Sequence, residues 1–197
     1  LTADGTISAA ALIQDRKVLR YIGKKYITAR REMGFLVPSK GYEYATIKGH
    51  KCAIIVGDDL SRERDFDQSV ETVISINARK YGKGTMTYRY EMMRNLAFVE
   101  SKNLVLVNQV GGSTDIVYDG TSGALNSRGE LVLMMKNFEE DFQIFDTKAS
   151  ARPITIPSTY NDRTRLVYEA ARCGLRDFFR KNGYRKASIG LSGGLGP

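Results

Sequence analysis

The segment Cys52-Ala53-Ile54-Ile55-Val56-Gly57-Asp58-Asp59-Leu60 places a short apolar run directly before a glycine and two carboxylates. Its consecutive β-branched residues are typical of a buried strand. The segment Thr72-Val73-Ile74-Ser75-Ile76 has the same character. The highly charged stretch 58–68 between them is either a loop or the start of a helix. The two apolar runs therefore predict two buried strands of a sheet.

Strand and helix patterns alternate along the rest of the chain. Residues 8–13 and 17–22 predict a hairpin, and residues 88–102 have the apolar spacing of an amphipathic helix that packs on a sheet. Further strand-like runs follow at 104–110, 115–118, 123–126 and 130–135, with a turn at 127–129. This order of elements predicts a layered α/β domain.

A change of character begins at residue 146. Residues 146–161 contain prolines, serines and threonines without a clear period and predict a linker. Asp162 can cap a helix over 163–181, which Asn182-Gly183 would end. One apolar stripe of this helix is expected to contain Leu166, Ala170, Gly174 and Phe178, with Val167, Ala171 and Leu175 beside it.

The end of the chain has the pattern of a nucleotide-binding loop. An expected strand at 187–191 runs into Ser192-Gly193-Gly194, and exposed N–H groups in such a loop can bind an anion. A helix, a strand and a glycine loop after a linker predict a second domain that has only begun. We therefore expect one domain over 1–145, a linker over 146–161 and the start of another domain over 162–197.

Composition limits the class of protein. The 197 residues are 42% hydrophobic, enough for one good core or one domain and a fragment of a second. The net charge is +8, but the basic residues are scattered and not interleaved with aromatics, which argues against a nucleic-acid binder. The absence of a long apolar run argues against a membrane protein, and the first residues look like a cut start without a signal pattern.

The two cysteines, Cys52 and Cys173, do not form a CxxC pair. This argues against a disulfide framework or a structural zinc site and fits a reducing, cytoplasmic setting. Both residues are expected in the core.

Two segments on either side of the linker resemble one family. Val107-Asn108-Gln109-Val110-Gly111-Gly112, with 115–122 and 126–130, is similar to the carboxyl half of the nitrilase-like glutaminase domain of glutamine-dependent NAD synthetases. Residues 174–184, leading to 190–194, look like the entry to the ATP-binding domain of the same enzymes. The resemblance runs from about Ser8 to the end of the chain.

The resemblance implies a fold and an activity. The fold would be an incomplete nitrilase-like α-β-β-α layered sandwich, followed by the first helix and strand of an adenine-nucleotide α-hydrolase-like domain. In the family, Glu, Lys and Cys release ammonia from glutamine, and the synthetase domain uses ATP and Mg to amidate deamido-NAD. The resemblance also implies a cytoplasmic homo-oligomer.

The catalytic lysine of the family has a counterpart here. Lys24, within the stretch 18–27, matches best in spacing, and Lys25 is its competitor. A fixed ammonium near the developing oxyanion lowers the barrier to amide cleavage. A solvated surface lysine is the alternative interpretation.

The catalytic cysteine has no counterpart. Gly57 occupies its position after the strand, so neither a thiolate nor a thioester can form there. Cys52 is no substitute, because a separation of five along a strand points it to the opposite face. The family's general-base glutamate lies upstream of the part that this chain resembles, and Glu32 is either a further family glutamate or a surface residue.

The substrate turn and the nucleotide loop are also altered. Arg79 and Lys80 replace a small hydroxyl residue and a proline, while Tyr81 and Arg89 are expected in the substrate pocket. Ser192, Gly193 and Gly194 match the ATP-binding loop, but Leu195-Gly196-Pro197 lacks the family's acidic residue, hydroxyl and one N–H donor. We therefore expect that this chain alone binds neither ATP nor Mg.

Two functions remain open at this point. The chain is a piece or a diverged relative of a glutamine-dependent NAD synthetase, inactive as written. Alternatively, it is a non-catalytic nitrilase-fold binding or assembly module. A basic nucleic-acid binder, which would show steeply salt-dependent affinity, ranks below both.

Overall fold

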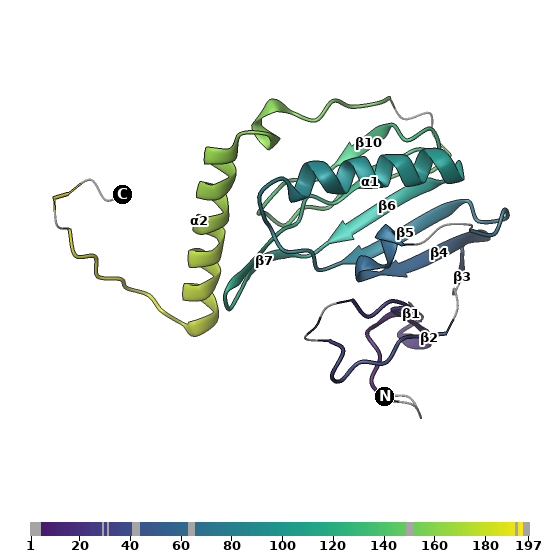
Figure 1. Ribbon diagram of the computed structural model, residues 1–197, viewed down its shortest axis with the longest axis horizontal. Coiled ribbons are helices and arrows are strands. Elements are labelled where there is room, and N and C mark those ends of the chain that lie inside the picture. The colour runs from purple at the N-terminus through teal and green to yellow at the C-terminus, as the bar shows by residue number, and fades with distance from the viewer. Residues whose placement is uncertain are drawn as a thin grey trace.

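A six-stranded mixed sheet forms the centre of the structure, with the strand order β10-β9-β6-β5-β4-β3 (Figure 1). The computed structural model describes residues 5–28, 30, 32–40, 44–62, 66–148, 152–191 and 193–194. The central strands β4 (His50–Val56), β5 (Thr72–Asn77) and β6 (Asn103–Asn108) are parallel. Three flanking strands are antiparallel to their neighbours. Strand β3 (Tyr44–Ile47) pairs with β4, β9 (Gly123–Leu125) pairs with β6, and β10 (Leu131–Met134) pairs with β9.

Helix α1 (Thr85–Glu100) covers one face of this sheet (Figure 1). Alternate residues of the central strands point toward it, as the two-residue period of a strand requires. The expected helix and both buried strands are confirmed, and the methionines of the helix are core residues. The shared core contains Ala53, Ile55, Val73, Leu104 and Leu106 from the sheet and Met92, Met93, Leu96 and Ala97 from the helix.

Two hairpins lie outside the central sheet. Strands β1 (Ala9–Gln14) and β2 (Lys17–Gly23) form the expected amino-terminal hairpin. Strands β7 (Val110–Ser113) and β8 (Ile116–Asp119) form the other. The strand predicted over 104–110 is confirmed as β6 up to Asn108, but its end is wrong, because the chain leaves the central sheet there and Val110 begins β7.

Short 3₁₀ helices occur in two segments, 58–68 and 146–161, for which the sequence predicted a loop or helix start and a linker. The charged stretch after β4 begins with a short 3₁₀ helix, η1 (Gly57–Ser61), so its first part is helical. The segment expected as a linker contains a second one, η2 (Ser158–Tyr160), and Ile156 and Tyr160 pack against the core. These two residues therefore attach this segment to the central sheet and α1.

Helix α2 (Arg163–Asn182) has the predicted ends. The Asp162 carboxylate accepts a hydrogen bond from the Arg165 N–H at 3.1 Å, and Gly183 ends the helix with a left-handed φ of 71°. The predicted apolar stripe is only partly right. Ala170 and Cys173 are buried, but Val167, Leu175 and Phe178 are at least half exposed.

Glycines explain which face of α2 is buried. A β-carbon added at Gly112 of β7 would lie 3.0 Å from the Cα of Gly174, so a side chain at this position would have to push the two backbones apart by a few tenths of an ångström. The Gly112 N–H also donates to the buried Asp177 carboxylate at 2.8 Å, and Lys181 Nζ donates to the Gly112 carbonyl. The helix is therefore oriented by backbone contact and polar bonds rather than by its largest apolar residues.

The strand predicted at 187–191 is wrong. These residues belong to no strand, and the side chains of Ile189 and Leu191 are about nine-tenths exposed. A strand needs a neighbour for its N–H and C=O groups, and within the described ranges no segment pairs with this one.

A buried polar network joins α1 to the ends of β6 and β8. The Arg89 guanidinium, which has no exposed surface, donates to both oxygens of Asp119 at 3.0 and 3.1 Å and to the Gly120 carbonyl at 3.2 Å. The Asn108 side-chain amide donates to Asp119 at 2.9 Å and to Gly120 at 3.0 Å. Several partners thus compensate both buried charges, although the buried Arg89 Nε–H has no hydrogen-bond partner among the described residues.

Replacing Gly112 by alanine should weaken the packing of α2. The added methyl group would meet the backbone of Gly174, which cannot rotate away, and overpacking of this kind costs about 1–3 kcal/mol. Urea unfolding followed by circular dichroism measures the loss. Gly190→Ala is the matched control, because nothing lies within 4 Å of its added methyl group. Equal stability of the two variants would contradict the contact.

Asp119→Asn should destabilise the whole fold. It leaves the Arg89 charge buried without its counter-charge, which costs about 3–5 kcal/mol when a buried pair is broken. The exposed Asp115, in the β7–β8 turn, is the control, and Asp115→Asn should change the unfolding free energy by no more than about 0.5 kcal/mol. A similar small change for Asp119→Asn would show that the pair does not support the fold.

Candidate functional site

The carboxyl ends of the parallel strands meet at one edge of the central sheet. Gly57 directly follows β4, Arg79 follows β5, and Asn108 ends β6. The Arg79 N–H donates to the Asn108 side-chain oxygen at 2.8 Å, which ties the last two of these strand ends together. Ligands in open α/β sheets bind outside the carboxyl ends of the strands. This edge is therefore the first place to look for a site.

A buried lysine faces the end of β4. Lys24 follows β2 and is 4% exposed. Its Nζ donates to Glu32 Oε2 at 2.7 Å, and this carboxylate is only a quarter exposed. Glu32 is therefore not a free surface residue, and the ion pair compensates the charge of the buried ammonium.

Gly57 lies against this ammonium. A β-carbon added to Gly57 would be 3.3 Å from Lys24 Cε and 3.5 Å from Lys24 Nζ. The φ angle of Gly57 is 65°, a left-handed conformation that favours glycine. Any side chain at position 57 would therefore project onto the lysine head group.

Asp59 fixes the segment that carries the lysine. Its buried carboxylate accepts hydrogen bonds from the Lys25 N–H at 2.6 Å and the Tyr26 N–H at 3.0 Å. Burial raises the pKa of Asp59, although the two N–H donors and Lys24 oppose this effect. Sequence reasoning missed this residue, and its only signal was the pair of aspartates directly after a buried strand.

The structure separates Lys24 from its competitor. The Lys25 Nζ lies 5.1 Å from the ring centroid of Tyr26, whereas the Lys24 Nζ lies beside Gly57 and Glu32. Of the two lysines, only Lys24 has its ammonium at position 57.

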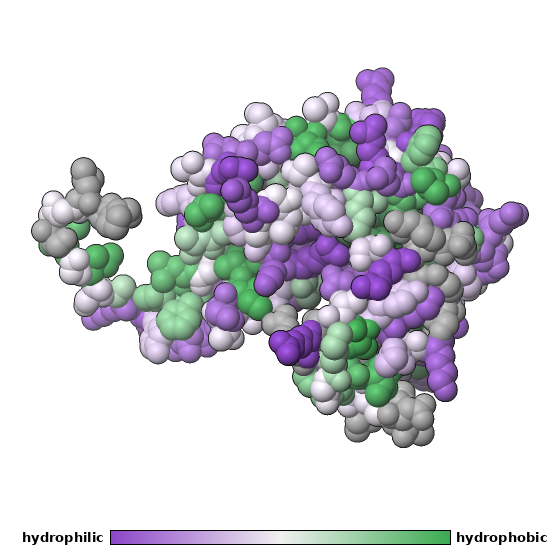
Figure 2. Space-filling view, viewed as in Figure 1, coloured by the Kyte–Doolittle hydropathy of each residue, from purple (hydrophilic) through white to green (hydrophobic). Residues whose placement is uncertain are grey.

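A pocket of about 620 Å³ begins at Asp58, the residue after Gly57, and neither Gly57 nor Lys24 is among its lining residues. Asp58, next to Gly57, forms an ion pair with Arg79 at 3.0 Å and lines the pocket. We call it the cationic pocket, and its other polar lining residues are Arg30, Lys80, Thr85, Tyr88 and Tyr118. In Figure 2, hydrophilic side chains gather between the β1–β2 hairpin and the side of the molecule that carries α2.

The structure does not bring the two expected pocket residues to this pocket. The Tyr81 ring packs edge-on against Phe138, with centroids 5.2 Å apart, and Arg89 is fully buried in the network with Asp119. Tyr88 and Tyr118 line the pocket instead. Tyr88 lies one turn into α1, and no sequence motif distinguished it from the exposed residues of that helix.

Neither cysteine lines the cationic pocket. Cys52 and Cys173 are buried free thiols, as expected, and burial raises the pKa of each. A high pKa keeps a thiol protonated and unreactive at neutral pH.

The described residues of the carboxyl-terminal glycine loop lie in open space. Ser192 and residues 195–197 lie outside the described residues. No atom lies within 4 Å of a β-carbon added at Gly190 or Gly193, and Gly194 is exposed. Among the described residues, no group of three or more His, Cys, Asp or Glu side chains could hold a metal ion. The described part of the loop therefore offers no cradle that fits ATP or Mg.

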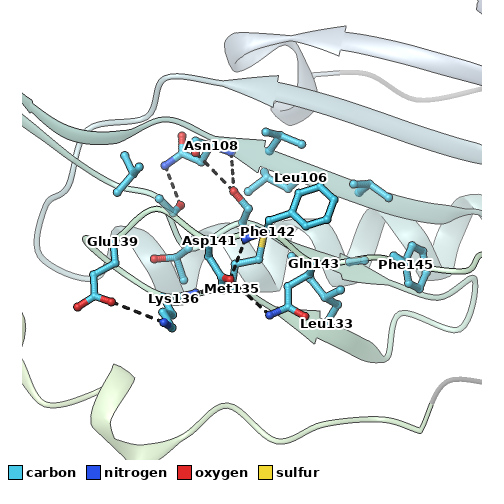
Figure 3. A pocket seen from close by; sticks show the side chains of 18 residues that line it. Leu106, Asn108, Leu133, Met135, Lys136, Glu139, Asp141, Phe142, Gln143 and Phe145 are labelled. Carbon is cyan, nitrogen blue, oxygen red and sulfur yellow. Dashed lines mark hydrogen bonds and ion pairs between the residues drawn. The ribbon is translucent and has the colours of Figure 1, made fainter.

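A second pocket, of about 330 Å³, lies between β6, β9, β10 and the segment that follows β10 (Figure 3). Its labelled side chains include Leu106, Leu133, Phe142 and Phe145, and the charged Lys136 and Glu139 lie 3.8 Å apart at its rim. It is mainly apolar and contains no cysteine. The cationic pocket is the better candidate for a polar ligand.

No helix in the described part of the chain has the length and apolarity needed to cross a bilayer.

The curated proteins that match the chain at the sequence level share one name, glutamine-dependent NAD(+) synthetase. No protein-family model matches the chain. The glutamine-dependent NAD(+) synthetase of Acinetobacter baylyi is 26% identical over 197 residues, which cover 95% of this chain and 36% of that protein. The chain thus spans about a third of the length of this curated relative.

Solved structures agree with the sequence comparison. The glutamine-dependent NAD+ synthetase of Acinetobacter baumannii, determined in complex with ADP, superposes with a TM-score of 0.75 at 26% identity and covers 92% of this chain and 36% of that one. A CN-hydrolase superfamily protein from Xanthomonas campestris has a TM-score of 0.60 at 15% identity and covers 86% of this chain and 64% of that one, a likeness of fold alone.

These neighbours confirm the predicted nitrilase-like α/β fold, and the relatives bear the name of an enzyme. The chain is similar in sequence and fold to glutamine-dependent NAD(+) synthetases, of whose length it spans about a third.

Proposed function

We propose that this chain is a diverged glutaminase-like part of a glutamine-dependent NAD synthetase that does not hydrolyse glutamine as written. The observation that supports this proposal is the contact between Gly57 and Lys24. The ammonium and its partner Glu32 are present, but the residue that faces them carries no side chain.

Amide hydrolysis through a thioester needs a thiolate at this place. The thiolate would attack the glutamine carbonyl, and the Lys24 ammonium would stabilise the oxyanion. The amide nitrogen would take up a proton and leave as ammonia when the C–N bond breaks, and water would then hydrolyse the thioester to glutamate. Gly57 supplies no atom that can form the covalent bond. Lys24 is the proposed catalytic lysine of the ancestral site, and Gly57 marks the position of its nucleophile.

The ligand pocket has changed as well. Arg79 reaches across to Asp58, and Lys80 adds a second cation where the family has small or rigid residues. Tyr81 and Arg89 were expected to bind substrate, but their packing against Phe138 and Asp119 supports a structural role in this chain.

The activity of the whole enzyme is also a proposal for this chain. In the complete enzyme, glutamine would supply ammonia that amidates deamido-NAD with ATP and Mg, in the cytoplasm. We propose a glutaminase-like domain over 1–145, a linker over 146–161 and the beginning of the ATP-binding domain over 162–197. Ser192, Gly193 and Gly194 would belong to the ATP site, which this chain alone does not complete.

A second candidate is a non-catalytic assembly module, and one observation favours it. The outer face of α2 exposes Val167, Tyr168, Leu175 and Phe178, and Figure 2 shows hydrophobic side chains gathered at the end of the molecule where α2 lies. Exposed apolar patches mark association surfaces. Homo-oligomerisation through this face would appear in gel filtration, and a strictly monomeric, folded chain would count against the module.

The purified chain should release no ammonia from glutamine. Gly57→Cys should restore a nucleophile near Lys24, whose positive charge lowers the thiol pKa. An electrophilic chloroketone analogue of glutamine should therefore alkylate Cys introduced at residue 57, detected by peptide mass spectrometry. The wild-type chain should stay unlabelled, because Cys52 and Cys173 are buried.

Lys24→Met in the Gly57→Cys background should slow this alkylation by about tenfold, since a pKa rise of one unit reduces the thiolate population tenfold. Circular dichroism of Gly57→Ala tests whether the fold accepts a side chain at this φ angle. Ammonia release by the wild-type chain that Lys24→Ala abolishes would overturn the proposal.

A further inference from the structure

We propose that the cationic pocket binds a small dicarboxylate rather than a neutral amide. This inference rests on the proposed function only in taking the pocket beside Gly57 as the ligand pocket of the domain. It assigns a class of ligand to the pocket, and it does not depend on whether any bond is cleaved there.

The charges of the lining residues do not balance. The pocket contains the cations Arg30, Arg79 and Lys80 and a single carboxylate, Asp58. Asp58 and Arg79 neutralise each other at 3.0 Å. Within the described ranges, neither Arg30 nor Lys80 has an ion-pair partner, and their two positive charges remain for a ligand.

The other lining groups suit the same chemistry. The hydroxyl groups of Tyr88 and Tyr118 can donate to oxygen atoms of a ligand. Thr85 begins α1, whose first turn contains no acidic residue and whose preceding Gly84 offers no side-chain cap. The positive end of the helix dipole at Thr85 is therefore not compensated from within the helix, which adds to the preference for negative charge.

Two carboxylates fit better than one compact anion. Arg30 lies in the segment after β2 and Lys80 in the segment after β5, so the two unpaired cations enter the pocket from separate elements. A volume of about 620 Å³ also exceeds the needs of a single inorganic ion and lies in the usual range for small organic ligands. Glutamine has a single carboxylate and could pair only one of the two cations, and its α-ammonium group would be repelled.

The position of the pocket explains how such a ligand would be held without reaction. Asp58 links the pocket to Gly57, so a bound dicarboxylate would lie beside the former nucleophile position. Carboxylates carry no leaving group for a thiolate, and the chain has no thiolate there. The site would therefore act as a reversible binding site for a small acid.

Isothermal titration calorimetry of the full chain at low ionic strength tests this assignment, with glutarate, glutamine and inorganic phosphate as probes. Glutarate should bind at least about tenfold more tightly than either other probe, because it alone can place a separate carboxylate against each unpaired cation. Added salt should weaken its binding. Arg30→Gln and Lys80→Gln should each weaken glutarate binding by about tenfold.

Lys83→Gln is the matched control, since Lys83 is an exposed lysine of the same loop that does not line the pocket, and it removes the same charge. Its affinity for glutarate should stay within about twofold of wild type. Equal binding of glutamine and glutarate, equal binding of phosphate, or an equal loss in Lys83→Gln would each overturn the dicarboxylate assignment. Ammonia release reports on the proposed function separately, so failure of one is distinguishable from failure of the other.

Discussion

The buried ion pair between Arg89 and Asp119 is the interaction on which the arrangement of the site depends. It joins α1 to the end of β8, and Asn108 adds the end of β6 to the same cluster. Two charges buried in this way are stable only while each has its partners, so the three elements are fixed relative to one another. Tyr118 precedes Asp119 and Tyr88 precedes Arg89, and both tyrosines line the cationic pocket. The pocket walls are therefore positioned by a structural pair just beneath them.

The parallel strands determine what meets at this edge. Their register aligns Val56 with Ile76 and Asn77 with Asn108, so the segments after β4 and β5 leave the sheet side by side. One segment carries Gly57 and Asp58, and the other carries Arg79. Asp59 then binds the backbone after β2 and brings Lys24 to the same place. A site assembled from three separate segments thus depends on backbone hydrogen bonds and one buried carboxylate.

Local patterns in the sequence were sufficient for the elements but not for their pairing. The ends of α2 were predictable because Asp162 and Gly183 act on adjacent backbone groups. The division of the strand after Asn108 was not, since it depends on which distant strand supplies the hydrogen bonds. The proximity of Lys24 to position 57 followed the family resemblance, but the roles of Arg89 and Asp59 come from burial and long-range partners that no local spacing reveals. The buried face of α2 was misjudged because glycine contact, not apolar volume, selects it.

The left-handed backbone at position 57 has a consequence for stability. A cysteine held at a φ of 65° would carry a conformational cost of about 1–2 kcal/mol, which glycine does not carry. An enzyme tolerates such backbone strain because the strained conformation orients the nucleophile toward the substrate. Under the proposed function, glycine at this position would avoid that strain and leave the ion pair between Lys24 and Glu32 undisturbed. The proposed absence of a nucleophile would then exchange catalytic power for stability, with the backbone geometry unchanged.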